Sequence, residues 1–220
     1  MEGSMVPTLT HEEESKLLKA LADEINTTRE HKRYKAVRDL VLILLGLRCG
    51  LRVGESQRLT VSMVWLKDEP VKSIHIPLGF NKNCLDAWIP VPPELTSALW
   101  IYVPTRLHHA APIETDPLLL VSQPGKIPRN PMMTRPVVSQ TMKHWAEKAN
   151  IRRFKYHSLR HTYATRFVQQ GTAHIRTIQQ LLRHRSISST QLYTHPTQDD
   201  AVIAVMKTFP GIADPPVLKI

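Results

Sequence analysis

With 220 residues, the chain is long enough for one domain with a hydrophobic core, or for two small domains. Its 29 Lys and Arg residues outnumber its 19 Asp and Glu residues, which gives a net charge of +10 and a pI near 9.8. Such a surface attracts polyanions, and nucleic acid is the commonest polyanionic partner. On charge alone, an anionic membrane surface and ribosomal RNA stay open.

The cysteines and the apolar segments exclude several classes of protein. Cys49 and Cys84 are the two cysteines of the sequence and do not form a CxxC pair. This argues against a disulfide scaffold and a cysteine-based zinc site, and it favours a cytoplasmic location. The most apolar run, residues 40–47, is far shorter than the ~20 residues of a membrane-spanning helix, so no membrane partner is expected. Residues 1–5 are interpreted as a remnant of an expression vector.

The spacing of apolar residues predicts a helix-rich domain with one small antiparallel sheet. Thr10 and Glu13 fit a capping box at the start of the first helix. Further helices are expected over 35–47, shortly after Arg52, over 93–107, 139–149, 157–170 and 175–182, and from about Ser186. β-Type residues on both sides of residues 79–85 predict a hairpin within 62–91. A short strand is expected at 118–121, inside a proline-rich loop.

Three segments that lie far apart in the sequence carry arginine or histidine near a turn or a helix end. They are GLRVGE (residues 50–55), HSLRHTYAT (157–165) and LLRHRSISSTQLYTH (181–195). Arginine suits a phosphodiester, because its planar guanidinium can bind two non-bridging oxygens at once. His157 and Arg160 are three residues apart and therefore share a face of their expected helix.

Tyr193 is the candidate nucleophile at phosphorus. The reference pKa of tyrosine is about 10, so only about one side chain in a thousand is ionised at pH 7. Attack therefore needs a base or a cationic field, and the pentacovalent transition state needs preorganised positive charge. Two arginines, two histidines and a lysine around one tyrosine would supply both without a metal ion or another cofactor.

The three segments look like the signature boxes of the tyrosine recombinases, the phage integrase family. The opening LTHEEESKLLKAL (residues 9–21) also resembles the start of that family's catalytic domain, so the resemblance covers nearly the whole chain. It implies a mainly α (α+β) catalytic domain over residues 6–196 and a tail over 197–220. An apolar run in the tail, residues 201–206, packs either on a neighbouring protomer or in the domain's own core. The family's N-terminal core-binding domain, which clamps DNA, is expected to be absent.

The resemblance also implies roles for individual residues. Arg52 and Arg160 would hold the scissile phosphate and stabilise its charge in the transition state. His157 would act as the general acid and base near the nucleophile. His184 would donate a hydrogen bond to a phosphate oxygen.

The remaining roles come from the same comparison. Lys82, in the turn of the expected hairpin, would protonate the leaving 5′ oxygen, and Glu55 would help to orient the basic residues. Tyr193 would form a 3′-phosphotyrosyl link and release a 5′ hydroxyl. Arg183 departs from the family pattern, which has a glycine at this position.

The sequence thus predicts a site-specific recombinase of double-stranded DNA. The resemblance implies a tetramer on DNA and leaves a monomer open for the free domain. A mobile-element integrase is the first choice within the class and a Xer-like dimer resolvase the second. A non-catalytic DNA-binding module of the same fold stays open.

A metal-dependent nuclease is a further alternative, because His157 and His161 are spaced to bind one zinc ion on a helix face. Ser158 stands where the zinc-protease motif has glutamate, and no third ligand is evident, so no metal site is expected.

Overall fold

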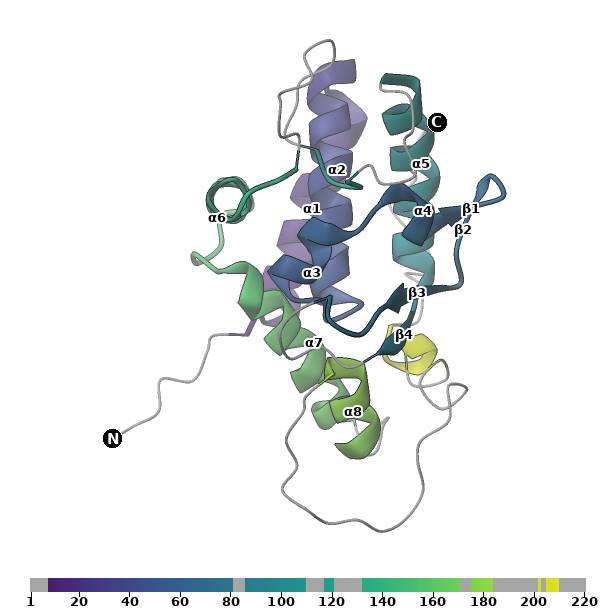
Figure 1. Ribbon diagram of the computed structural model, residues 1–220. Coiled ribbons are helices and arrows are strands. Elements are labelled where there is room, and N and C mark those ends of the chain that lie inside the picture. The colour runs from purple at the N-terminus through teal and green to yellow at the C-terminus, as the bar shows by residue number, and fades with distance from the viewer. Residues whose placement is uncertain are drawn as a thin grey trace.

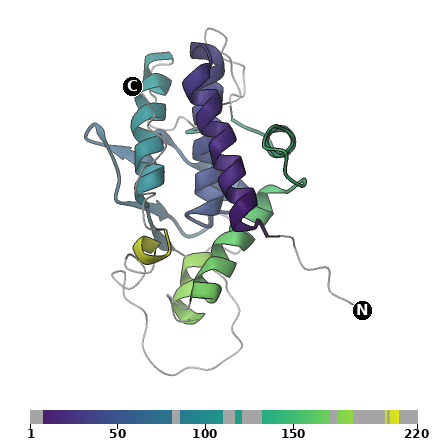
Figure 2. The same cartoon turned by 180° about the vertical axis from the view of Figure 1, so that it is seen from behind.

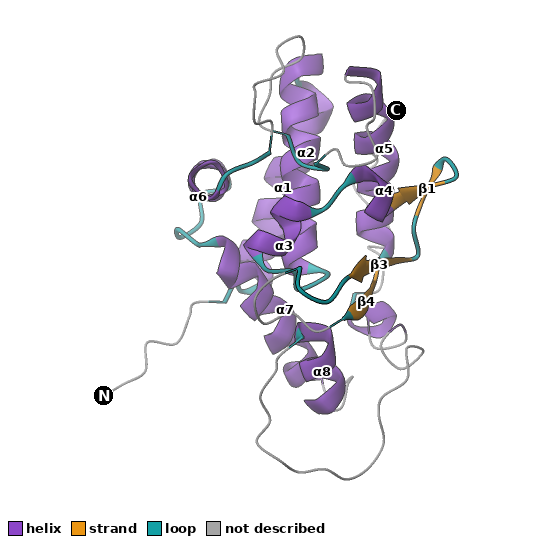
Figure 3. Ribbon diagram, viewed as in Figure 1, coloured by secondary structure: helices purple, strands orange, loops and turns teal. Residues whose placement is uncertain are grey.

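The computed structural model describes residues 8–80, 86–109, 117–120, 132–170, 175–183, 202 and 205–209 (Figure 1). The helices are α1 (His11–Thr27), α2 (Glu30–Leu47), α3 (Val53–Arg58), α4 (Val61–Val64), α5 (Pro93–His109), α6 (Arg135–Lys148), α7 (Tyr156–Gln170) and α8 (Ile175–Leu182). The strands are β1 (Trp65–Leu66), β2 (Glu69–Pro70), β3 (Ser73–Ile76) and β4 (Ala87–Pro90). The expected fold class, mainly helical with small antiparallel β structure, is confirmed (Figure 3).

Helix α2 lies at the centre of the domain. Its last seven residues, 41–47, are all buried, as expected for a helix segment that is apolar on every side. The helix packs against α1, α5 and α7, and Figures 1 and 2 show α1 and α5 running alongside it. Since residues 48–52 follow directly, the core fixes the position of this loop.

The helix boundaries follow the sequence prediction in part. The capping box is confirmed: the Glu13 amide donates to Thr10 Oγ1 at 3.1 Å, and the Thr10 amide donates to Glu13 Oε2 at 2.9 Å. Helix α2 begins at Glu30, earlier than the sequence predicted. Its first turn is polar, so apolar periodicity gave no sign of it. Helix α6 also begins earlier than predicted, at Arg135. In the sequence Pro136 suggested a loop, but proline is favoured in the first turn of a helix.

The strands of the predicted hairpin are confirmed. Strand β3 pairs antiparallel with β4, and Ile74 lies opposite Ile89. A second hairpin, formed by β1 and β2, was not expected. Its turn residues Lys67 and Asp68 have φ values of 52° and 60°, a conformation that is common for glycine, asparagine and aspartate but not for lysine. The β structure is therefore two small sheets rather than one.

Residues 117–120 contradict the strand expected at 118–121. They form isolated bridges instead, with Pro117 opposite Thr60 and Leu120 opposite Met132. Leu118 is fully buried, so the apolar run marks a core segment, which periodicity alone does not distinguish from a buried strand. The helix expected from about Ser186 lies outside the described residues.

Two glycines at the end of α2 allow α7 to approach closely. A Cβ atom on Gly46 would lie 2.9 Å from Cβ of Leu159, and one on Gly50 would lie 2.5 Å from Cδ1 of Tyr163. Gly50 also has a φ of +59°, a left-handed conformation that a Cβ atom disfavours. The close approach places α7 against the loop that joins α2 to α3.

The described part of the tail packs on its own chain. Phe209 stacks on Tyr163 with ring centroids 5.6 Å apart, and the Arg48 guanidinium lies 4.6 Å from the centre of the Phe209 ring. Arg48 is held in turn by Glu14, at 2.6 Å. Val205 and Phe209 therefore belong to a core cluster of their own protomer, whereas packing of the tail on a neighbouring protomer stays a prediction.

The close contact at Gly50 generates a stability prediction. Gly50→Ala should lower the free energy of unfolding by about 2–5 kcal/mol, because the added Cβ meets the Tyr163 ring and the left-handed backbone disfavours it. Gly79→Ala is the matched control, because Gly79 also has a positive φ, of +83°, but no atom lies within 4 Å of its added Cβ. The control should lose only about 1–2 kcal/mol in urea denaturation. Equal losses for the two variants would contradict the close packing of α7 on the loop.

Candidate active site

The first part of the site is built at the start of α3. Arg52 is the residue before the helix, in extended conformation, and the third helical residue is Glu55. The Arg52 amide donates to Glu55 Oε2 at 2.7 Å, and Arg52 Nη1 donates to Glu55 Oε1 at 2.9 Å. The Glu55 side chain is fully buried, whereas 29% of the Arg52 side chain is exposed. The carboxylate therefore satisfies the helix end and holds the arginine at the surface of the site.

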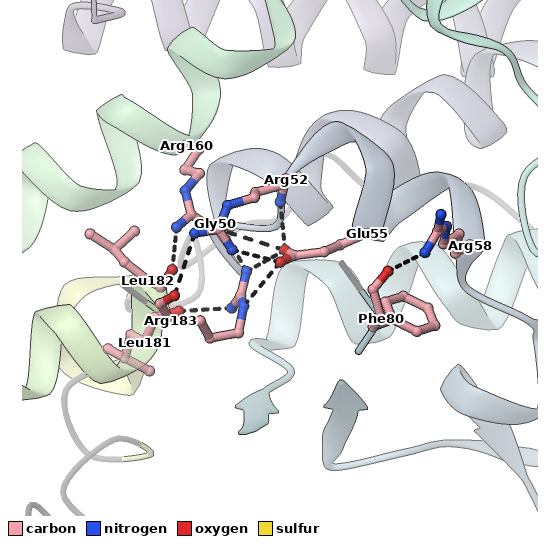
Figure 4. Close-up of polar contacts among 9 residues, drawn as sticks. All are labelled: Gly50, Arg52, Glu55, Arg58, Phe80, Arg160, Leu181, Leu182 and Arg183. Atoms are coloured by element: carbon pink, nitrogen blue, oxygen red, sulfur yellow. Dashed lines mark hydrogen bonds and ion pairs between the residues drawn. The ribbon is translucent and has the colours of Figure 1, made fainter. Parts of the chain in front are cut away.

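Arg160 reaches the same place from α7. Its Nη1 donates to the carbonyl oxygen of Gly50 at 2.5 Å, and its Nη2 donates to the carbonyl oxygen of Leu182. Nη1 also lies 4.0 Å from Glu55 Oε2. The structure thus brings Arg52, Glu55 and Arg160 together, as Figure 4 shows.

Arg183 is a third arginine in this cluster, and the sequence did not predict it as a site residue. It follows the last residue of α8, and its side chain is fully buried. Its Nη2 lies 2.5 Å from Glu55 Oε2 (Figure 4). The one signal in the sequence is an arginine at a helix end where the resembling family has glycine, which gives no indication of the partner.

The cluster holds more positive than negative charge. Burial, together with the guanidiniums of Arg183 and Arg52, lowers the pKa of Arg160 to about 9. Burial alone would raise the pKa of Glu55, but the charge and hydrogen bond of Arg183, together with the hydrogen bonds from Arg52, keep that pKa below its usual value. An anion that entered the cluster would relieve the repulsion among the guanidiniums. The arrangement is therefore suited to bind a phosphate group.

His157 lies on α7 with its side chain exposed, one turn before His161. The two imidazole ring centroids are 4.4 Å apart. Partial desolvation lowers the pKa of His157, and the nearby charges of His161, Arg160 and Arg52 lower it further. His157 is thus within the electrostatic reach of both arginines, and it is biased toward the neutral form that can accept a proton.

Three of the predicted site residues lie outside the described residues: Lys82, His184 and Tyr193. Residues close to Lys82 and to His184 are described, whereas the neighbours of Tyr193 also lie outside the described residues. The carbonyl oxygen of Phe80, two residues before Lys82, accepts a hydrogen bond from Arg58 of α3 (Figure 4). Arg183, directly before His184, lies within the cluster. Phe80 and Arg183 are therefore both held against α3.

Two other kinds of feature are absent from the described part of the chain. There, no group of three or more His, Cys, Asp and Glu side chains is arranged to hold a metal ion. None of the helices in that part has the length and apolar character that crossing a membrane requires.

The chain belongs to the phage integrase family, whose sequence profile matches residues 7–200. It is 30% identical over 206 residues to the tyrosine recombinase XerC of Listeria monocytogenes serovar 1/2a. That alignment covers 93% of this chain and 63% of the XerC relative. The chain therefore spans less than two thirds of the length of this curated relative.

Solved structures share the fold. A crystal structure of XerA recombinase has a TM-score of 0.64 at 24% identity, over 96% of this chain and 64% of the other. The Tn1549 transposon integrase, residues 82–397, in complex with circular intermediate DNA has a TM-score of 0.60 at 20% identity. That match covers 91% of this chain and 67% of the integrase. The catalytic-domain fold expected from the signature boxes is thereby confirmed.

The shared carboxylate generates a prediction on stability and pH. Glu55→Gln should lower the free energy of unfolding by about 3–5 kcal/mol at pH 7, because it leaves buried guanidiniums without their negative partner. The folded-state pKa of Glu55 lies below its ordinary value, so its contribution is complete above pH ~4.5 and is lost as the pH falls through the folded-state pKa.

Denaturant unfolding between pH 3 and pH 7 tests this, and the two proteins should converge in stability at the acid end. Glu147→Gln is the control, because Glu147 pairs with Arg153 on the surface, where both side chains are more than half exposed. It should cost less than about 1 kcal/mol. A difference between wild type and Glu55→Gln that stays constant with pH would contradict the assignment of the charge to Glu55.

Proposed function

We propose that the protein is a site-specific DNA recombinase that cleaves and rejoins strands through a covalent 3′-phosphotyrosyl intermediate. One observation carries the proposal: Arg52 and Arg160, from distant segments, meet at one buried carboxylate, with the start of the third signature box beside them. The likeness to the XerC relative supports the same activity. The Tn1549 integrase, which shares the fold, was solved in complex with circular intermediate DNA, and this supports double-stranded DNA as the partner.

The proposed reaction needs no metal ion and no ATP. Arg52 and Arg160 hold the scissile phosphate, and their charge stabilises the pentacovalent transition state. His157, biased toward its neutral form, accepts the phenolic proton of Tyr193. The phenolate oxygen bonds to phosphorus while the bond to the 5′ oxygen breaks, and Lys82 supplies that oxygen with a proton.

The second half of the reaction reverses the first. A 5′ hydroxyl of a partner strand attacks the phosphotyrosyl link and releases Tyr193, so the energy of the phosphodiester is retained. In this proposal His184 donates a hydrogen bond to a phosphate oxygen, and Glu55 orients the arginines. The active assembly is a homotetramer on DNA, and its cytoplasmic location stays a prediction.

Within this class we favour an integrase of a mobile element. The XerC relative favours a dimer resolvase as the second candidate. The DNA that flanks the coding sequence distinguishes the two, because attachment repeats on both sides mark a mobile element. A single chromosomal site recombined in every cell cycle would mark a resolvase.

Covalent capture tests the activity. The protein is incubated with a randomised pool of nicked duplexes, and DNA that stays attached under denaturing conditions is amplified and sequenced. We expect a defined site to be enriched and to form an adduct with wild type but not with Tyr193→Phe. An adduct of equal yield with Tyr193→Phe would disprove the assignment of the nucleophile. Binding with a steep salt dependence but no adduct on any duplex would instead indicate a non-catalytic DNA-binding module.

Arg160 should act on the chemical step more than on binding. Arg160→Ala is expected to slow adduct formation by about 100-fold or more, while DNA affinity changes far less, because its contact strengthens in the transition state. Single-turnover rates and fluorescence anisotropy on the captured site measure the two effects. Arg160→Lys serves as a second variant if the alanine variant unfolds. Arg153→Ala removes an exposed arginine outside the cluster and should leave the rate unchanged. Equal losses of rate and affinity would make Arg160 a DNA-contact residue only.

A further inference from the structure

Arg183 occupies a position that is unfavourable for any residue with a Cβ atom. It follows the last residue of α8 with a φ of 53°, in the left-handed region where helices commonly end on glycine. Its amide donates to the carbonyl oxygen of Gln180 at 2.9 Å, so the backbone still closes the last turn. Since glycine would close this helix end without strain, the arginine side chain must contribute something that glycine cannot.

The side chain of Arg183 connects three parts of the site. Its Nη2 lies 2.5 Å from Glu55 Oε2 and 3.2 Å from the carbonyl oxygen of Gly50. Its Nε lies 3.4 Å from Glu55 Oε1, and its Nη1 donates to the carbonyl oxygen of Leu181 at 2.8 Å. The guanidinium therefore fixes the end of α8 to the loop before α3 and to the shared carboxylate (Figure 4).

Arg183 also changes the charge that Arg52 and Arg160 present. Among the residues that the structure describes, the ion pairs of all three arginines in the cluster go to Glu55. Arg183 makes the shortest of these contacts, whereas Arg160 stays at 4.0 Å. With glycine at position 183, the single carboxylate would be shared by two guanidiniums instead of three. The arginine therefore raises the excess of positive charge in the cluster by one.

We infer that Arg183 is a positioning residue of the phosphate pocket. It neutralises Glu55 and anchors the end of α8, so that the charges of Arg52 and Arg160 are left to an incoming phosphate diester. The inference rests on the proposed function, because the diester is the substrate of that reaction. Arg183 itself is buried and does not touch the substrate, and so it acts through Glu55.

Inorganic phosphate is a probe that needs no knowledge of the DNA site. Its binding is measured by calorimetry at constant ionic strength with wild type, Arg183→Gly and Arg52→Gln. Arg183→Gly should bind phosphate about tenfold more weakly, because one unit of positive charge is lost close to the anion. Arg52→Gln locates the signal, because loss of binding in this variant assigns the measured phosphate to the cluster.

Lys67→Gly is the matched control. Lys67 is also a cation with a positive φ, of 52°, and it is exposed on the β1–β2 turn. Its replacement makes the same change of charge and the same relief of the backbone, away from the cluster. Phosphate binding should therefore stay at the wild-type value.

A second substitution separates charge from a purely structural role. If Arg183→Gly does not fold, Arg183→Lys keeps the charge and the backbone strain but loses the forked contacts. It should keep most of the phosphate affinity. The inference fails if Arg183→Gly binds phosphate as wild type does, or if Arg183→Lys binds it no better than Arg183→Gly does.

The adduct assay keeps this inference separate from the proposed function. If wild type forms no adduct while phosphate binding responds to Arg183 as expected, the recombinase proposal fails and the role of Arg183 in the anion pocket stands. If wild type forms the adduct and Arg183→Gly changes neither its rate nor phosphate binding, the proposed function stands and the inference fails.

Discussion

The geometry of the candidate site depends on one buried carboxylate. Glu55 accepts the amide of Arg52 and so completes the start of α3, and it also pairs with arginines from α7 and from the end of α8. A buried carboxylate without cationic partners would be strongly unfavourable, and buried guanidiniums without it would be equally so. Ion pairs as well as apolar packing therefore hold α3, α7 and α8 in position relative to one another.

Backbone carbonyl groups also hold these arginines in place. The carbonyl oxygen of Gly50 accepts from both Arg160 and Arg183, and the carbonyl oxygen of Leu182 accepts from Arg160. Gly50 has a left-handed conformation, and its missing Cβ leaves room for the Tyr163 ring beside it. The cationic cluster is thus built on main-chain oxygens of the α2–α3 loop and of the last turn of α8, where carbonyl groups lack partners within the helix.

The sequence predicted the features that have local or family-wide signals. Apolar periodicity located most of the helices, the Thr10–Glu13 pair marked the start of α1, and the signature boxes predicted that Arg52 and Arg160 would meet. It did not predict that Arg183 pairs with Glu55, because a contact between segments so far apart leaves no local pattern. The turn at Lys67 and Asp68 was missed for a different reason: aspartate tolerates that backbone conformation, but lysine is not typical of it.

The sequence separations within the cluster bear on how the protein is made. Arg183 contacts Glu55 across 128 residues and Gly50 across 133. A ribosome releases the chain from its N-terminus, so α1 to α3 emerge long before the end of α8 does. Until then Glu55 lacks its closest partner, and the carbonyl oxygens at the end of α8 are not yet there to hold Arg160. A nascent chain therefore completes this arginine cluster only after the end of α8 has left the ribosome, long after α1 to α3 have emerged.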